Sequence, residues 1–288
     1  MPLEFMKLNQ RDLAGLTRER TVFFFPVGPL EGHGPHLPIG LDLMAAKELS
    51  FRLAQQLEKE MPEWTAILMP ETSLGIDSNT STLKLTVRPH VLRDWLVDAC
   101  RALVKSGFLY FTCVSGHLGP RQLTAIEEAG KIIKRKSGFF RRFRGHFLSL
   151  SSACVSGKEV SRAPFWVKAE EHGGEKDTSI ALGLSEWTGQ NLVAPLYLNL
   201  PPQQKGDYWG NPAIASVAKG DEWFSSDLNR IFPKLRRVLE GAPPRSLFRS
   251  WYSVLPPNWS FFRGWIFLVL TFLMMALWVY VSLKFYES

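Results

Sequence analysis

The chain has 288 residues, of which 45% are hydrophobic and 21% charged, so it can bury a core and is neither a fibrous repeat nor a disordered tail. Its formal net charge of +7 comes from two basic stretches, residues 131–144 and 230–263, while the remainder is acidic overall, which argues against a general binder of nucleic acid. Three cysteines, an odd number without a Cys-x-x-Cys pair, suggest neither a disulfide framework nor a structural zinc site.

Short apolar strands alternate with amphipathic helices through the first half of the chain. We expect strands over residues 21–27, 65–70, 108–114 and 146–153, and helices around 42–60, 89–106 and 120–136. This alternation predicts an α/β fold in which helices cover both faces of a mostly parallel sheet. In such folds ligands gather outside the carboxyl ends of the strands.

Potential metal ligands follow the first expected strand, in the Gly/Pro-rich segment GPLEGHGPHLPIGLDL. They are Glu31, His33, His36 and Asp42, four such residues within twelve positions. A single histidine in a loop is more often a hydrogen-bonded structural residue than a ligand. Four together at a strand end favour a site for a divalent cation.

Two later segments carry the same residue types. SGHLGP places His117 after the strand at 108–114, and EEHGGEKDTS holds a second group of ligands. That group comprises Glu170, Glu171, His172, Glu175 and Asp177. Side chains from several strand ends can converge on one or two cations, and nitrogen and oxygen donors without thiolates suit Zn²⁺, Mn²⁺ or Fe²⁺.

In this order the motifs resemble those of the creatininase (creatinine amidohydrolase) family. The pattern P-V-G-x-x-E-x-H-G-P-H-L-P-x-G-x-D is followed by G-H-x-G, by E-H-G-G-E and by the late segment KGDYWGNPAIASVAKG, residues 205–220. The resemblance covers roughly residues 1–240. It implies a three-layer α/β/α fold, a binuclear metal centre, a small-molecule amide substrate and assembly into a homo-oligomer.

The resemblance also assigns the metal ligands residue by residue. Glu31 and His117 would hold one ion, His33 and Glu175 the other, and Asp42 would bridge both. The implied ions are Zn²⁺ paired with Zn²⁺, Mn²⁺ or Fe²⁺.

A catalytic role is implied for His172, which would shuttle a proton near the substrate, with Glu171 beside it. Water bridging two cations loses a proton near neutral pH. The resulting hydroxide would attack the carbonyl of an amide, cyclic amide or formamide, and His172 would protonate the leaving nitrogen. The expected activity is that of a metal-dependent hydrolase of carbon–nitrogen bonds other than peptide bonds.

Two segments depart from the family pattern and keep an alternative open. The family's N-G-H-G-G-N has Ser115 and Pro120 in place of its outer asparagines, and Leu83 to Thr86 replace its F-P-G-T. These changes favour a catalytically inactive, membrane-anchored binding or scaffold protein with a creatininase-like fold. The five preserved ligands favour the hydrolase.

The C-terminal region predicts a membrane anchor, because residues 264–283 are 20 consecutive residues without a charged side chain. At 1.5 Å per residue such a helix spans about 30 Å, the thickness of a bilayer's hydrocarbon core. A buried core helix seldom lacks charge on every face. We therefore expect a hydrolase domain over residues 1–240, a proline-rich linker over 241–260, a single transmembrane anchor over 261–284 and a short tail over 285–288.

The positive charges near this span predict its orientation. Seven Lys and Arg residues precede it within residues 230–263, and only Lys284 follows it. Because cytoplasmic flanks are enriched in Lys and Arg, the domain is expected to face the cytoplasm. The partners expected from the sequence are therefore a small amide and membrane lipid, with no nucleic acid.

Overall fold

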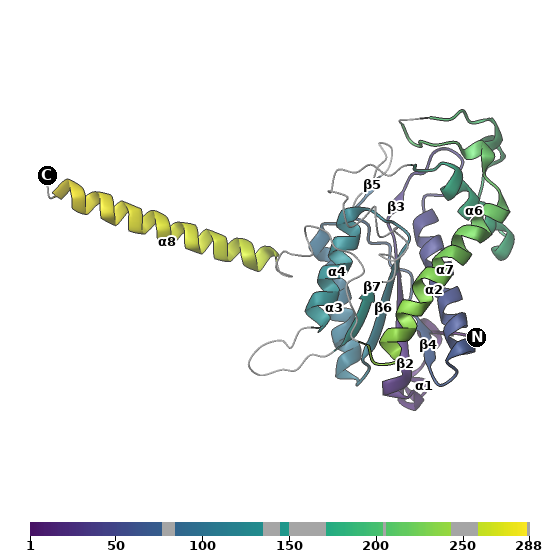
Figure 1. The fold of residues 1–288 in the computed structure, drawn as a ribbon, viewed down its shortest axis with the longest axis horizontal. Coiled ribbons are helices and arrows are strands. Elements are labelled where there is room, and N and C mark those ends of the chain that lie inside the picture. The colour runs from purple at the N-terminus through teal and green to yellow at the C-terminus, as the bar shows by residue number, and fades with distance from the viewer. Residues whose placement is uncertain (77–83, 135–144, 150–170, 204–205, 243–258, 287–288) are drawn as a thin grey trace.

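The structure is a computed structural model that describes residues 1–76, 84–134, 145–149, 171–203, 206–242 and 259–286 (Figure 1). Its central sheet has five strands in the order β1-β4-β2-β6-β7, and every neighbouring pair is parallel. These strands are β1 (Leu3–Glu4), β2 (Thr21–Val27), β4 (Thr65–Leu68), β6 (Tyr110–Ser115) and β7 (His146–Ser149). A second, two-stranded antiparallel sheet pairs β3 (Leu30–Glu31) with β5 (Lys84–Leu85).

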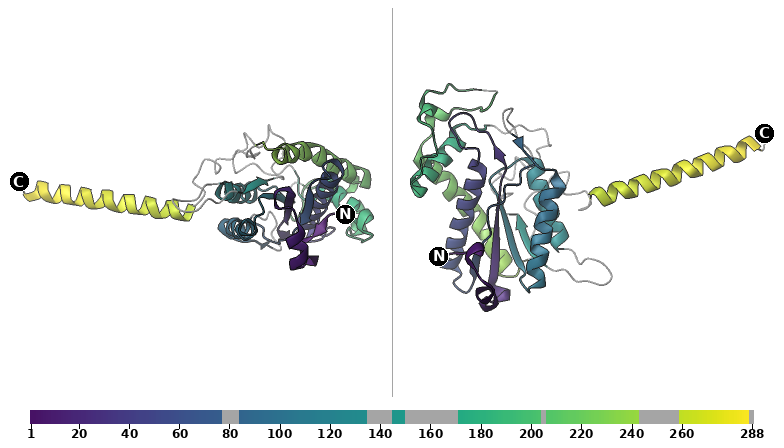
Figure 2. Two further views of the ribbon diagram at one scale, coloured as in Figure 1. Left: turned by 90° about the horizontal axis from the view of Figure 1, so that it is seen from below. Right: turned by 180° about the vertical axis from the view of Figure 1, so that it is seen from behind.

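Helices cover both faces of the central sheet, as Figures 1 and 2 show. One layer contains α2 (Leu41–Glu60), α6 (Glu175–Thr188) and α7 (Val217–Leu239), and the other contains α3 (Pro89–Lys105) and α4 (Pro120–Lys134). The remaining described helices are α1 (Gln10–Gly15), the 3₁₀ turns η1 (Phe5–Lys7), η2 (Arg18–Arg20), η4 (Pro195–Asn199) and η5 (Pro212–Ile214), and α8 (Trp259–Tyr286). The three-layer α/β/α architecture predicted from the sequence is confirmed.

The central strand β2 explains why the layers hold together. All seven of its residues are buried, and alternate side chains enter opposite cores: Val22 and Phe24 pack toward α2, α6 and α7, whereas Phe23 and Phe25 pack toward α3 and α4. Burying each phenylalanine contributes about 1.5–3 kcal/mol. An uninterrupted apolar run is therefore what a parallel strand between two helical layers requires.

Most of the strands and helices predicted in the first half of the chain are present with small shifts. The strand expected over 65–70 ends at Leu68, because Pro70 has no N–H to donate to a neighbouring strand. Residues 135–144 and 150–170 lie outside the described residues, and with them most of the basic stretch at 131–144 and the second half of the strand expected at 146–153.

α8 carries the apolar segment identified in the sequence. Its window Ile266–Lys284 spans 19 residues with a mean hydropathy of 2.4, and none of it is buried against the described chain. Figure 1 shows it as one straight helix. The helix is long and apolar enough to cross a membrane. The predicted linker over 241–260 falls mostly within residues 243–258, which are outside the described residues.

Candidate metal centre

The candidate ligands lie where the sheet's strands end, on segments that come from different parts of the chain. Glu31 is the last residue of β3, Asp42 is in the first turn of α2, and His117 follows β6. His33 lies in the loop between Glu31 and α2, and His172 lies in the segment before α6. All five side chains are buried. The fold thus brings segments that are far apart in the sequence together at one edge of the sheet.

The imidazole of His117 lies between two carboxylates. Its Nδ1 is 2.9 Å from Oε1 of Glu31 and 3.3 Å from Oδ2 of Asp42. These three side chains come from β3, from α2 and from the loop after β6, so the arrangement depends on the packing of all three segments. Three potential donor atoms therefore face the same small space: Nδ1 of His117, Oε1 of Glu31 and Oδ2 of Asp42.

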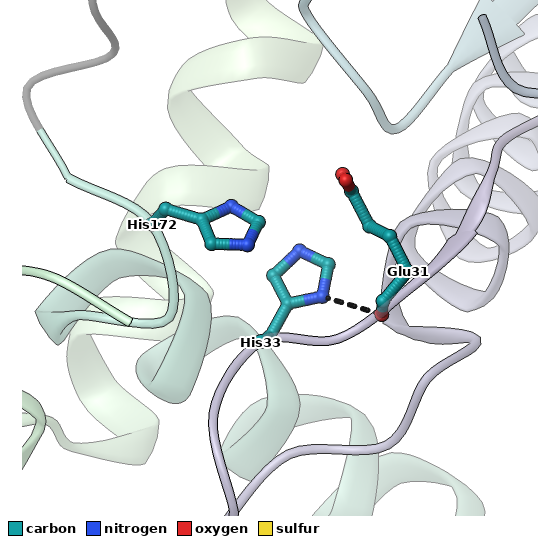
Figure 3. Close-up of side chains that lie close together, drawn as sticks. All are labelled: Glu31, His33 and His172. Atoms are coloured by element: carbon teal, nitrogen blue, oxygen red, sulfur yellow. Dashed lines mark hydrogen bonds between the residues drawn. The ribbon is translucent and has the colours of Figure 1, made fainter. Parts of the chain in front are cut away.

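His33 faces the other oxygen of the same aspartate. Its Nε2 is 3.4 Å from Oδ1 of Asp42, and its Nδ1 is 3.2 Å from the main-chain carbonyl oxygen of Glu31 (Figure 3). A carbonyl can only accept, so Nδ1 carries the hydrogen in this contact and Nε2 keeps its lone pair when the ring is neutral. Histidines that bind metals are commonly oriented in this way.

The spacing of these donor atoms fits a divalent cation. Ligands about 2.0–2.2 Å from one cation lie roughly 2.8–3.1 Å from their neighbours in octahedral geometry and roughly 3.3–3.6 Å in tetrahedral geometry. The measured separations are 2.9, 3.3 and 3.4 Å. Two groups can each offer three donor atoms within 4.8 Å of one another: Glu31 with Asp42 and His117, and Glu31 with His33 and His172. Adjacent groups that share a residue are what a binuclear centre needs.

The electrostatics of the site favour positive charge. Burial disfavours the charged imidazole of His33, but Asp42 outweighs this effect and raises the pKa of His33 to about 9. Burial likewise opposes protonation of His117, whereas hydrogen bonds to Asp42 and Glu31 raise the pKa of His117 to about 10. The pKa of Asp42 lies well below its ordinary value, because the two imidazoles outweigh the cost of burial. Divalent cations would replace these protons.

His172 is held between two rings. It stacks on His33 with ring centroids 4.3 Å apart, and on Trp209 with centroids 4.8 Å apart. Its Nε2 lies 2.8 Å from the carbonyl oxygen of Gly32 and must donate to it. Burial, followed by the charge of His33, lowers the pKa of His172. A neutral His172 thus keeps the lone pair of Nδ1, and Figure 3 shows its ring facing that of His33.

Glu175 is placed differently from the other predicted ligands. It is the first residue of α6, and its carboxylate forms an ion pair with Lys219 of α7. About a third of its side chain is exposed, and it belongs to neither group of clustered donors among the described residues. The structure therefore brings four of the five predicted ligands together and holds the fifth beside a lysine.

Glu171 caps α6. Its two carboxylate oxygens accept hydrogen bonds from the main-chain N–H groups of Glu175 and Lys176, at 3.0 and 2.7 Å. The first N–H groups of a helix have no partner within the helix, so this contact stabilises the start of α6 and the segment that carries His172. Burial raises the pKa of Glu171.

His36, also named as a potential ligand, lies outside both donor groups. It is buried, with Nε2 3.0 Å from Oγ1 of Thr178, and its ring meets that of Tyr208 edge-on at 5.6 Å between centroids. It joins the loop before α2 to the first turn of α6. Glu170 lies outside the described residues.

Two glycines allow the segments around the site to approach closely. A Cβ on Gly116 would collide with the carbonyl oxygen of Asp42, and Gly173 has φ +64° and faces the carbonyl oxygen of His33. Side chains are rarely tolerated at positive φ, and none fits against a backbone at this distance. The G-H and H-G-G motifs thus have a steric role next to the histidines that they contain.

Three further residues at the site have roles that the sequence did not reveal. Trp209 stacks on His172, Asp177 accepts a hydrogen bond from the N–H of Gly173 at 2.7 Å, and Ser115 donates to the carbonyl oxygen of His117 at 2.7 Å. Asp177 stands in a recognised motif and Trp209 in the late Gly-rich segment, but no spacing rule connects either of them with its partner.

Comparison with known proteins gives the same family as the motifs. A family model described as "Creatininase: Creatinine amidohydrolase" matches residues 6–232. No curated protein matches the sequence.

Solved structures of creatininases share the fold. A crystal structure of creatinine amidohydrolase (creatininase) is 18% identical, with a TM-score of 0.60, over 84% of this chain and 99% of that one. A creatininase mutant of the Zn-Zn type is 19% identical, with a TM-score of 0.61, over 83% and 99% of the two chains. A structure named "Creatininase Mn" is 19% identical, with a TM-score of 0.59, over 83% and 99% of the two chains.

Proposed function

This chain belongs to the creatininase family, whose model matches residues 6–232, and we propose that it is a metal-dependent amidohydrolase acting on a C–N bond of a small molecule. The observation that carries the proposal is the buried carboxylate of Asp42, whose two oxygens face different histidines, His33 and His117. Such an arrangement suits a carboxylate that joins two cations. Family members are metal-dependent amidohydrolases, and the described donor groups fit that chemistry.

We propose that Glu31 and His117 hold one divalent cation, that His33 and Glu175 hold the other, and that Asp42 binds both. All of these residues except Glu175 already converge in the structure, and Glu175 would have to leave Lys219 to join them. Because the related structures include a Zn-Zn type and a Mn form, Zn²⁺ and Mn²⁺ are the cations to test first.

The cations, when bound, would supply a water that is nucleophilic near neutral pH and would polarise the substrate carbonyl. His172 is placed to move a proton at Nδ1, because Nε2 is engaged by the carbonyl of Gly32. Its lowered pKa keeps the ring neutral and able to accept a proton, which it would then pass to the leaving nitrogen. Trp209 and His33 hold the ring plane from both sides. Amides, cyclic amides and formamides are the substrate classes proposed.

We also propose that α8 tethers this domain to a membrane, with the domain on the cytoplasmic side. Support comes from the 19-residue window Ile266–Lys284, with a mean hydropathy of 2.4, and from the Lys and Arg residues that precede it. A homo-oligomer is expected from the family and would be detected by light scattering of the detergent-solubilised chain.

The test of the proposed function combines metal analysis with a substrate screen. The full chain in detergent, supplied with Zn²⁺ and Mn²⁺, is expected to retain about two equivalents of metal and to hydrolyse at least one member of a panel of amides, cyclic amides and formamides. A chain that retains no metal would contradict the proposal. Retention of metal without turnover across the panel would favour the inactive scaffold suggested by Ser115, Pro120 and the segment from Leu83 to Thr86.

A further inference from the structure

Two buried polar side chains form a hydrogen-bond relay that ends on the main chain of His117. Nε2 of Gln122 donates to Oγ of Ser115 at 3.5 Å, and Oγ of Ser115 donates to the carbonyl oxygen of His117 at 2.7 Å. Gln122 is fully buried and Ser115 is 3% exposed. In such surroundings a chain of hydrogen bonds polarises each member and is stronger than the same bonds in water.

The orientation of Gln122 is fixed by the segment after β4. Its Oε1 accepts from the N–H of Ile76 at 3.0 Å, and its Nε2 also donates to the carbonyl oxygen of Leu74 at 3.2 Å. A main-chain N–H on one side and a carbonyl on the other allow only one orientation of the amide. Gln122 therefore presents a hydrogen to Ser115 from a fixed position near the start of α4.

His117 needs support of this kind because, among the described residues, only one of its two ring nitrogens has a hydrogen-bond partner. Nδ1 faces Glu31 and Asp42, whereas Nε2 makes no hydrogen bond to any residue in the part of the chain that the structure describes. Metal-binding histidines usually gain their orientation from an acceptor at the second ring nitrogen. Here the ring position depends on the main chain of residues 115–117, which Ser115 and the bond from the N–H of Gly116 to the carbonyl of Val27 hold in place.

Pro120 is compatible with this arrangement. It is the first residue of α4, a position where the missing N–H has no partner within the helix in any case. The helix begins there and places Gln122 two residues later. The outer residues that differ from the family motif, Ser115 and Pro120, thus belong to one local structure that directs a relay to His117.

We propose that Ser115, oriented by Gln122, is the positioning residue for the donor group of Glu31, Asp42 and His117. The inference rests on the proposed function, since it assigns Ser115 a role in metal binding. Donor distances around a cation tolerate changes of only about 0.2 Å, so a shift of the His117 main chain weakens binding. Removing an outer hydrogen bond to a metal ligand typically lowers metal affinity about 10–100-fold.

The experiment compares two buried serines in the full chain in detergent. Zn²⁺ affinity is measured by competition with a chromophoric chelator, and Co²⁺ loading is followed by its visible absorption. Ser115→Ala is expected to bind one of two equivalents about 10–100-fold more weakly and to change the Co²⁺ spectrum. Ser50→Ala is the matched control, because Ser50 is also buried and donates to the carbonyl of Ala46 at 2.7 Å within α2. Ser50→Ala is expected to leave the affinities for both metal equivalents unchanged.

Two further variants separate positioning from general stability. Ser115→Thr keeps the hydroxyl and is expected to bind metal as tightly as the wild type. Gln122→Met keeps the side-chain volume but removes the hydrogen-bond donor, so it is expected to bind the same metal equivalent more weakly. Gln122→Met also tests the inference if Ser115→Ala does not fold. Equal affinities in the wild type, Ser115→Ala and Gln122→Met overturn this inference alone. A wild-type chain that binds neither cation overturns the proposed function together with it.

Discussion

Oδ1 of Asp42 lies 3.4 Å from Nε2 of His33, which joins the first turn of α2 to the loop that follows β3. The other oxygen of the same carboxylate lies 3.3 Å from Nδ1 of His117. One side chain therefore contacts both histidines of the proposed ligand set. Its removal would affect two metal positions rather than one.

Asp42→Ala is expected to reduce bound metal from about two equivalents to less than one, since it removes a ligand from both positions. The change also removes the carboxylate that pairs with the charged imidazoles of His33 and His117. Their loss of this partner is expected to destabilise the metal-free protein by about 3 kcal/mol. Metal analysis and urea unfolding measure the two effects. Asp98→Ala is the control, because Asp98 is exposed on α3 and pairs only at the surface with Arg101. Unchanged metal content in Asp42→Ala would contradict the assignment.

Metal binding is expected to depend on pH through His33 and His117. Their pKa values are raised to about 9 and about 10, so at neutral pH a cation must displace a proton from each ring. Because protons compete less well as the pH rises, affinity for Zn²⁺ should increase between about pH 6 and 8, with up to two protons released per protein. Titration calorimetry in buffers of different ionisation enthalpy measures this release. No release at neutral pH would show that the rings are already neutral.

The sequence predicted the parts of the fold that depend on local pattern. The apolar run of β2 and the helix at 42–60 follow from residue periodicity, and the carboxyl ends of parallel strands must lie on one edge, which is why Glu31 and His117 could be expected to meet. Contacts made by packing between distant segments could not be read in the same way. The ion pair of Glu175 with Lys219 depends on how α6 and α7 pack, and no spacing within either helix encodes it.

His172 is expected to act on protons rather than to hold a cation, although its ring lies within one donor group. His172→Gln should therefore keep about two equivalents of metal while hydrolysis of a substrate found in the amide screen falls about 10²–10⁴-fold. Metal analysis and initial rates on the same preparation separate the two roles. Loss of one equivalent would instead identify His172 as a ligand of the second cation.

The proposed role of Glu175 as a metal ligand can be tested by also changing Lys219, its ion-pair partner. If Glu175 is a ligand of the second cation, Glu175→Gln should lose about one equivalent, and Lys219→Met should bind that equivalent more tightly because the carboxylate is released from its ion pair. An exposed pair of this kind contributes at most about 1 kcal/mol, so the gain should not exceed about fivefold. Lys176→Met, at the next position in α6, is the charge-matched control. Full metal content in Glu175→Gln would remove it from the ligand set.

The tether predicted for α8 can be tested with a single charge at its centre. Met275 is the middle residue of the apolar window Ile266–Lys284, and Met275→Arg is expected to cost about 2.5–3.5 kcal/mol of insertion free energy. The variant should shift from the membrane pellet to the soluble fraction after alkaline extraction, whereas Leu3→Arg, at an exposed position in the domain, should stay with the wild type.

The orientation of the anchor can be tested separately. Because seven Lys and Arg residues precede the span within 230–263, protease added to the outside of sealed cells should leave the domain intact. Cleavage of the domain there would reverse the orientation without removing the anchor, and solubility of the wild type would remove both.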